Sequence, residues 1–366
     1  MPWNVVFGAT YVGKKGTHLY FAGDNNRDFL GPQIENNPGL VNNLLTYVNN
    51  PFAQVNGGPI SDPNSALSYS TIQESELQTP YPQFPGSVTT DEPPIANSTY
   101  HALQLTANKA YSNGLELAAS YTWSKSLDDS SMYDTNVAWL ANYGPQSGWA
   151  LQDPNRPETE RGLSTFDVPS MLKFSYSYDL PFGRGRALFS NMPRLLDYII
   201  GGWKTNGIWE IHSGRPLQFF VSNGGIPLPT YGPQRPNFIG MPKRNYGSES
   251  VWVNNFFANA YDPPASGPDN STIQAPTPFT LGTAPRTTGD IRTPLAFTSD
   301  LSIAKQFLLS NWHEGIRLEL RLEANNAFNH PVFGSPDMGI GDGTFGQITY
   351  LAVGPRQGQL VLKLSF

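Results

Sequence analysis

The sequence predicts an all-β fold, namely a portion of an antiparallel transmembrane β-barrel with about eight long strands in a meander. Three observations support this prediction. Several long segments alternate strictly between apolar and polar residues, which is the period of a strand. Charged residues make up 14% of the chain, below the roughly 25% of ordinary globular proteins. The connections between the segments alternate between long and short, as they do in outer-membrane barrels.

Each predicted strand is at least as long as the roughly 9 to 11 residues that a tilted strand needs to cross a bilayer. The 35 glycines and 33 prolines are typical of a turn-rich β-protein. The eight segments are Trp3 to Val12, Tyr100 to Tyr111, Gly114 to Lys125, Phe166 to Leu180, Gly202 to Ser213, Leu295 to Leu308, Gly315 to Phe328 and Arg356 to Phe366.

The connections predict which end of the barrel faces outward. A tight turn at Ser112 to Gly114 joins the second and third segments, and another short connection follows Leu308. The connection after Leu180 is of moderate length. Long extracellular loops are expected at about 13–99, 126–165, 214–294 and 329–355. If Phe366 is periplasmic, every short connection lies on the periplasmic side.

Alternation also predicts which side chains face the lumen. In "IRLELRLEANN" the leucines share one face, and charged residues share the other. The residues expected to face the lumen are Lys173, Lys204, Glu210, His212, Arg317, Glu319, Arg321 and Glu323. Because charges in a closed lumen need partners, the last four should pair with neighbouring strands, for example with Asp300 and Lys363.

Aromatic residues near strand ends are expected to form the girdles that mark the two membrane interfaces. These residues are Tyr121, Trp123, Tyr178 and Trp203. The chain also ends on an apolar strand pattern, formed by Leu360, Leu362, Leu364 and Phe366. Outer-membrane lipid is therefore an expected partner.

Two other folds remain open at this point. A soluble β-sandwich also alternates apolar and polar positions, and its last strand would be an ordinary edge strand. Eight strands can also close a barrel on their own, but side chains then just fill its interior. The long inward residues favour a wide lumen, so we expect an open, curved sheet whose first and last strands are unpaired in isolation. Such edges promote aggregation.

Several motifs resemble the C-terminal barrel region of TonB-dependent outer-membrane receptors. They include "SYTWSKSLDDSS", "ERGLSTFDVPSMLKFSYSYDLPFGRGR", "GGWKTNGIWEIHSGRPL", "RLEANNAFNHPVFG" and "FGQITYLAVGPRQGQLVLKLSF". The resemblance is to the Oar-like group, whose complete members carry a carboxypeptidase-regulatory-like domain before the plug. It implies residues 1–366 of a partial receptor barrel, the last part of a barrel of about 22 strands.

The resemblance also implies partners and a place in the cell. The expected location is the outer membrane of a Gram-negative-type bacterium, and the expected role is import of an unidentified ligand. The C-terminal strand ending in Phe366 is similar to the signal read by the barrel-assembly machinery. We expect no signal peptide, TonB box, plug or N-terminal domain in this chain, so TonB would act only through the plug region. The alternative is a plugless or soluble β-rich binding or adhesion module.

The sequence predicts no enzyme and no cofactor. The chain has no cysteine, and its histidines (His18, His101, His212, His313 and His330) lack metal-ligand spacing. "GIGDGTFG" at Gly339 to Gly346 is not followed by a helix pattern and is expected to be a flexible loop. Asp128, Asp129, Asp337 and Asp342 are expected to be solvated loop acids, with a loop cation as the alternative. The net charge of −6 argues against nucleic acid as a partner.

Overall fold

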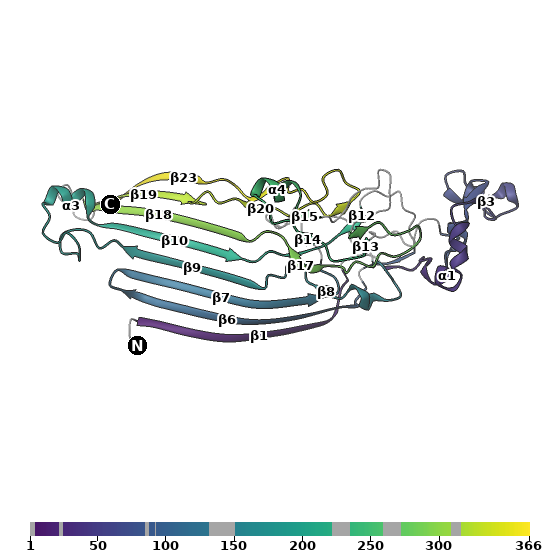
Figure 1. Ribbon diagram of the computed structural model, residues 1–366, viewed down its shortest axis with the longest axis horizontal. Helices are drawn as coiled ribbons and strands as arrows, with labels where there is room; N and C mark the ends of the chain where they lie inside the picture. Colours follow the sequence, from purple (N-terminus) through teal and green to yellow (C-terminus); the bar gives the residue numbers. More distant parts are fainter. Residues whose placement is uncertain are drawn as a thin grey trace.

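A single long sheet of antiparallel strands dominates the molecule. In this computed structural model the described residues are 4–21, 25–84, 88–91, 93–131, 151–221, 235–258, 272–308 and 316–366. The sheet order is β1-β6-β7-β9-β10-β18-β19-β23, and the short β8 (Gly162–Leu163) pairs with β7 (Figure 1). The bounds are β1 Val5–Leu19, β6 Ala96–Ser112, β7 Leu115–Asp128, β9 Ser170–Asp179, β10 Trp203–His212, β18 Ala296–Leu308, β19 Arg317–Asn325 and β23 Gln357–Ser365.

This meander confirms the antiparallel all-β prediction, with changes at several strand ends. The strand β1 continues to Leu19 and β6 begins at Ala96, so the first connection covers 20–95 instead of 13–99. The strand β9 begins at Ser170, because residues 162–169 form β8 and a turn instead. A soluble sandwich would divide these strands between two facing sheets, whereas one sheet contains all eight.

The strand β1 lies at one edge of the sheet and β23 at the other (Figure 1). Among the described residues, β1 pairs with β6 and β23 pairs with β19, and no pairing joins β1 to β23. A closed eight-stranded barrel would require that pairing.

Local chemistry explains the tight turn and one close approach within the sheet. Asn113 and Gly114 connect β6 to β7, and both have positive φ, at 52° and 80°. Two such residues in succession are what a two-residue hairpin turn requires, so the predicted turn is confirmed. Within β10, a Cβ added to Gly207 would lie 2.4 Å from the Tyr176 ring. Only glycine allows that ring to cover the strand.

The two ends of the sheet differ. The turn end holds the β6–β7 turn, both chain termini and the helix α3 (Arg194–Ile200) of the β9–β10 connection (Figure 1). At the other end, the long connections fold into a group of small elements that we call the loop cap. Within the described residues, no helix is long and apolar enough to cross a membrane.

The loop cap consists of two-stranded pairings and short helices. The pairings are β2–β5, β3–β4, β11–β17, β12–β21, β13–β16, β14–β15 and β20–β22. The strand bounds are β2 Asn25–Asn26, β3 Tyr47–Asn49, β4 Thr71–Gln73, β5 Thr89–Thr90, β11 Pro216–Leu217, β12 Phe220–Val221, β13 Asn237–Phe238, β14 Lys243–Arg244, β15 Phe257–Ala258, β16 Ile273–Gln274, β17 Thr288–Arg292, β20 Val332–Phe333, β21 Gly339–Ile340 and β22 Leu351–Val353. The helices are α1 Gly31–Asn36, α2 Glu74–Leu77 and α4 Glu249–Asn254, with 3-10 turns at Pro38–Asn42, Gln54–Asn56, Ala66–Ser68 and Pro157–Glu160.

The main hydrophobic core lies in the loop cap. It gathers side chains from connections that are distant in sequence: Leu217, Phe219, Phe256, Phe257, Ile273, Ile291, Met338, Ile340 and Ile348. Phe219 packs on Phe257 with ring centroids 5.1 Å apart, and Trp252 packs edge-on against Phe333 at 4.6 Å. The loops are therefore held together in the way a soluble domain is held.

Candidate functional site

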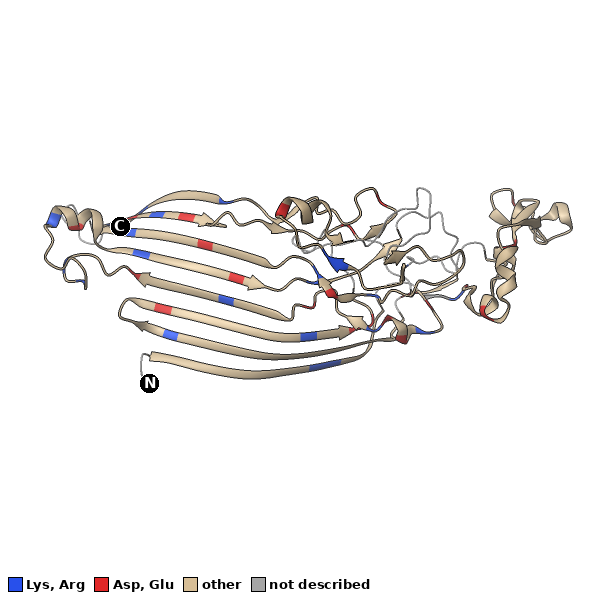
Figure 2. Ribbon diagram, in the orientation of Figure 1, with Lys and Arg blue, Asp and Glu red and all other residues tan. Residues whose placement is uncertain are grey.

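Strand register places all eight residues predicted to face the lumen on one face of the sheet, which we call the polar face. Opposite residues in neighbouring strands share a face. Glu210 lies opposite both Lys173 and Thr298, and Glu319 lies opposite both Gln306 and Lys363. Charged residues occur at intervals along several of the strands (Figure 2). That this face lines a lumen stays a prediction.

A cavity lies over the loop-cap end of the polar face, and three of these residues line it. Lys173, Glu210 and His212 come from β9 and β10, and the Lys173 Nζ to Glu210 Oε1 distance is 3.1 Å. The volume is about 380 Å³. The remaining lining residues are Arg215, Thr293, Pro294, Ala296, Thr298, Val332, Phe333, Ala352 and Val353. We call this cavity the polar-face pocket.

The pocket combines charged groups with an apolar wall. Arg215 is 3% exposed, and a reciprocal pair of hydrogen bonds holds its backbone to Thr293. Val332 and Phe333, from β20, form part of the wall. Such a pocket fits a ligand with a polar or charged group attached to an apolar body. The sequence pattern identified Lys173, Glu210 and His212, but the contribution of Arg215 required the fold.

The charges of β19 pair along their own strand. Arg321 donates to Glu319 from Nε at 2.8 Å and from Nη2 at 2.5 Å, and its Nη1 lies 2.9 Å from Glu323. Neutral amides on neighbouring strands complete the row, because Gln306 donates to Glu319 and Gln359 donates to Glu323.

The predicted ion pairs of these residues with Asp300 and Lys363 are therefore wrong in detail. Asp300 accepts a hydrogen bond from the backbone N–H of Asn326. Lys363 lies opposite Glu319, but the ion pairs of β19 join Arg321 to residues of its own strand. Residues two apart on a strand share a face, so these side chains reach each other without crossing to another strand.

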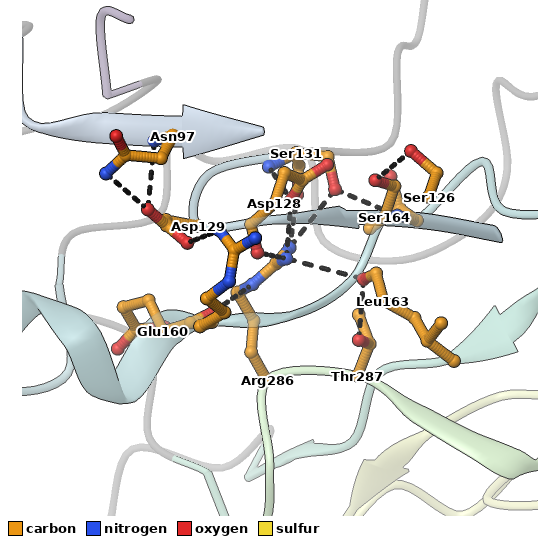
Figure 3. Close-up of polar contacts among 12 residues, drawn as sticks. Asn97, Ser126, Asp128, Asp129, Ser131, Glu160, Leu163, Ser164, Arg286 and Thr287 are labelled. Atoms are coloured by element: carbon orange, nitrogen blue, oxygen red, sulfur yellow. Dashed lines mark hydrogen bonds and ion pairs between the residues drawn. The ribbon is translucent and has the colours of Figure 1, made fainter. Parts of the chain in front are cut away.

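A buried arginine joins the loop cap to the sheet. Arg286 is 6% exposed, and its Nη2 lies 2.5 Å from Asp128 Oδ1 at the end of β7 (Figure 3). The same guanidinium donates to the backbone carbonyls of Asp128, Ser131, Glu160 and Leu163. Arg286 thus joins its own segment to two others, residues 128–131 and 160–163. Sequence reasoning missed it because its partners lie more than 100 residues away.

Two more arginines extend this network. Arg235 pairs with Glu160 at 2.9 Å, and both side chains are about 6% exposed. Burial lowers the pKa of Arg235, whereas the Glu160 carboxylate opposes that change. Arg292 of β17 pairs with Asp167 at 2.8 Å.

Of the four acids predicted to be solvated, Asp128 and Asp129 are buried and ion-paired, whereas Asp337 and Asp342 are half-buried. Asp128 pairs with Arg286, and Asp129 pairs with Arg161 at 2.9 Å. Asp337 accepts hydrogen bonds from the Gly339 N–H and from the Thr344 hydroxyl, which organises the glycine-rich segment into β21 and a turn. Among the described residues, no group of three His, Cys, Asp or Glu side chains could hold a metal ion. His313 lies outside the described residues.

The opposite face of the sheet, which we call the apolar face, carries all four aromatic residues that were predicted to form girdles, although Tyr121 is not near a strand end. Tyr178 and Trp203 lie at the turn end, Trp123 lies toward the loop cap, and Tyr121 is in the middle of β7. Trp123 is 63% exposed. A second cavity, of about 670 Å³, is lined in part by Tyr11, Trp123 and loop residues. The membrane boundaries themselves stay a prediction.

The C-terminal residues lie at the sheet edge and are open to a partner. Leu360, Leu362 and Leu364 of β23 are 55–67% exposed on the apolar face, and Phe366 is 99% exposed. Their reading by the assembly machinery stays a prediction.

Comparison with known proteins identifies a family. The family model described as "Outer membrane beta barrel domain" matches residues 1–359, nearly the whole chain. A search of curated proteins gives no match.

Proposed function

Because this chain belongs to the outer membrane beta barrel domain family, we propose that its sheet is part of the barrel wall of a TonB-dependent transporter of the Oar-like type. Family membership places the protein in the outer membrane. The proposed role is import of an unidentified ligand, which binds at the loop cap and the polar-face pocket and then passes along the polar face. The loop cap would be extracellular and the turn end periplasmic.

The observation that carries the proposal is the arrangement of the sheet edges. The strands β1 and β23 stand at opposite ends of the sheet order, and their outer edges are unpaired among the described residues. Unpaired strand edges are not tolerated in a bilayer, so each needs a further strand. A barrel wider than eight strands has room for a plug and a ligand path. The charged row on β19 gives a plug polar groups to contact.

We propose transport instead of catalysis, because the charges of the pocket are arranged for binding. Lys173 and Glu210 neutralise each other, and the backbone of Arg215 is held to Thr293, so the groups that line the pocket are fixed in place. The proposed partners follow from the same arrangement. They are lipid on the apolar face, the barrel-assembly machinery at Leu360 to Phe366, and TonB through a plug.

The proposal can be tested with a tag in the loop cap of the protein in its source bacterium. A small epitope inserted next to Tyr246, which is 86% exposed, should leave the sheet intact. After in vivo cross-linking, the tagged protein purified from the outer membrane should carry a TonB adduct. Its barrel should contain more strands than the eight described here, so the folded barrel should exceed 40.2 kDa. A plugless barrel with the same tag is the control.

A surface binding or adhesion module is the second candidate, favoured by the well-packed core of the loop cap. It predicts no TonB adduct and a folded barrel of 40.2 kDa. That combination would overturn the transport proposal.

A further inference from the structure

The connection between β9 and β10 exposes an unusual amount of apolar surface. Its helix α3 turns only Asp197 inward, and the other six residues are exposed. Five of these six are apolar or aromatic: Leu195 is 82% exposed, Leu196 47%, Tyr198 59%, Ile199 69% and Ile200 41%. The preceding turn adds Leu188 and Phe189, at 47% and 64%. A helix in water would present its polar residues outward.

Side chains from the apolar face fix the carbonyl end of α3. Lys305 of β18 is 4% exposed, and its Nζ donates to the Gly201 carbonyl at 2.6 Å and to the Asp197 carbonyl at 3.3 Å. Trp203 Nε1 donates to the Ile199 carbonyl at 2.8 Å. Register places Lys305 and Trp203 opposite each other, on the same face as Leu320. The helix is therefore attached to the face that carries the apolar side chains.

These hydrogen bonds satisfy the C-terminal carbonyl groups of α3, as is required of a helix end that lies next to lipid. The last carbonyls of a helix lack partners within the helix, and water cannot supply partners in an apolar environment. Here Lys305 and Trp203 supply them. The Lys305 Nζ lies over the Trp203 and Phe307 rings, 5.7 Å and 5.2 Å from the ring centroids. The Lys305 ammonium group is thus carried to the polar end of α3, which is the snorkelling expected at an interface.

The charges around α3 match a phospholipid surface. Arg184, Arg186 and Arg194 are all exposed, and the one acid of the helix, Asp197, is turned toward the backbone N–H of Arg184. Basic residues lie on the α3 end of the molecule, beyond the strand ends (Figure 2). Exposed arginines beside exposed leucine and isoleucine are the composition of a helix that lies in a membrane interface.

We propose that residues 181–201 form an interfacial foot, in which α3 lies in the phospholipid leaflet at the turn end of the sheet. The apolar side chains of α3 continue the lipid-contacting face of the barrel wall, and the three arginines contact lipid phosphates. The foot would fix the depth and tilt of β9, β10 and β18 in the bilayer. This inference rests on the outer-membrane family and does not depend on transport.

A protein occupant of this surface fits less well. A plug fills the lumen and would meet the polar face, whereas the polar bonds of α3 are to Lys305 and Trp203 on the apolar face. A further barrel strand would add at β1 or β23, and β9, β10 and β18 are interior strands with neighbours on both sides.

The test uses single cysteines, since the chain has none of its own. Leu195→Cys and Ile199→Cys variants of the protein, purified from the outer membrane as the assembled barrel, are labelled with an environment-sensitive fluorophore. They are then reconstituted in vesicles of phosphatidylethanolamine and phosphatidylglycerol, and the fraction that floats with the vesicles is measured. Quenching by headgroup-level nitroxide lipids is compared with quenching by iodide in the water. Tyr246→Cys in the loop cap is the matched control, because Tyr246 is an exposed aromatic residue away from the proposed interface.

Both α3 labels should be quenched several-fold more by the nitroxide lipid than the Tyr246 label, and less by iodide. Quenching by iodide alone would place the helix in water, and protection from both quenchers would place it under protein. Either result overturns the proposal. Quenching of both labels by the nitroxide lipid should also be higher with phosphatidylglycerol than in phosphatidylcholine alone. Equal quenching would overturn the assignment of the arginines to lipid phosphates.

Discussion

Apolar side chains are buried in the loop cap but exposed on one face of the long sheet. In the loop cap, Phe219 and Phe256 are 1% and 0% exposed within a core of the kind found in soluble domains. On the sheet, Phe7 and Leu360 are 78% and 67% exposed although they lie within regular strands, β1 and β23. The loop cap therefore carries its own hydrophobic stabilisation, whereas the sheet leaves its apolar face exposed, as we expect of a face that lipid covers.

Charged residues show the same contrast. The Arg286 and Asp128 side chains are 6% and 9% exposed, whereas those of Lys173 and Glu210 are 50% and 35% exposed. Removing one partner of a buried ion pair destabilises a protein strongly, whereas removing one partner of an exposed pair costs little stability. Substitutions in the two regions should therefore differ in how much stability they remove and in which part of the molecule is destabilised.

The largest effect is expected at Arg286. Replacing it by methionine leaves the Asp128 carboxylate buried without its partner, which should destabilise the loop cap by about 3–5 kcal/mol. Hydrogen exchange of the protein in vesicles should show faster exchange in β8 and β17, with β19 unchanged. Arg161→Met is the control, because Arg161 is 40% exposed and Asp129 keeps the two hydrogen bonds that it accepts from Asn97, so the loss should cost about 1 kcal/mol or less. Equal effects of the two substitutions would break the contrast between buried and exposed pairs.

A core substitution tests whether the loop cap folds as a soluble unit does. Phe219→Ala removes a fully buried ring that packs on Phe238 and Phe257, and should destabilise the loop cap by about 3–5 kcal/mol. Phe7→Ala removes a similar ring from the exposed apolar face of the sheet, and it leaves no enclosed cavity if lipid covers that position, as we propose. Its smaller effect should be measurable by urea unfolding in vesicles. A larger effect for Phe7 would mean that protein covers that face.

A charge on the apolar face tests the role of lipid. Leu320→Arg should cost about 2–4 kcal/mol if the position is near the bilayer midplane. Ser302→Arg is the matched control, because Ser302 lies on the polar face opposite Glu323. Stability in lipid vesicles should fall for the first variant and stay nearly unchanged for the second. Equal stabilities would mean that the apolar face is not in lipid while the polar face is in water.

The sheet was predictable from sequence because its order is local. Each strand alternates with period 2, and the Asn113–Gly114 turn is encoded in adjacent residues. The same alternation predicted which residues lie on the polar face, including three residues that line the polar-face pocket. Strand ends were less predictable, since β1 continues through Gly13 and Gly16 with no change in pattern that marks Leu19 as its end.

The loop cap was not predictable, because its order is non-local. Arg286 contacts Asp128 across 158 positions, and Arg235 contacts Glu160 across 75. Neither arginine lies in a periodic pattern, so nothing near it in the sequence identifies its partner. The pairing of Arg321 failed for a related reason. Alternation places a side chain on a face but does not choose between neighbours on that face, and here residues of the same strand are the partners.

The smallest expected effect concerns the Lys173–Glu210 pair of the polar-face pocket. Both side chains are partly exposed, and the 3.1 Å pair lies across two strands, so its coupling energy should be about 1 kcal/mol or less. A double-mutant cycle of Lys173→Met and Glu210→Gln, read by unfolding in vesicles, measures that coupling directly. Added salt should lower it further, since the pair is accessible to ions. A coupling of several kcal/mol that does not respond to salt would mean that the pocket is closed off from water in the assembled barrel. The Lys173–Glu210 pair would then be as strong as the buried ion pairs of the loop cap. The contrast between weak pairs on the sheet and strong pairs in the loop cap would therefore not hold at the polar-face pocket, where we propose that both regions contact the ligand.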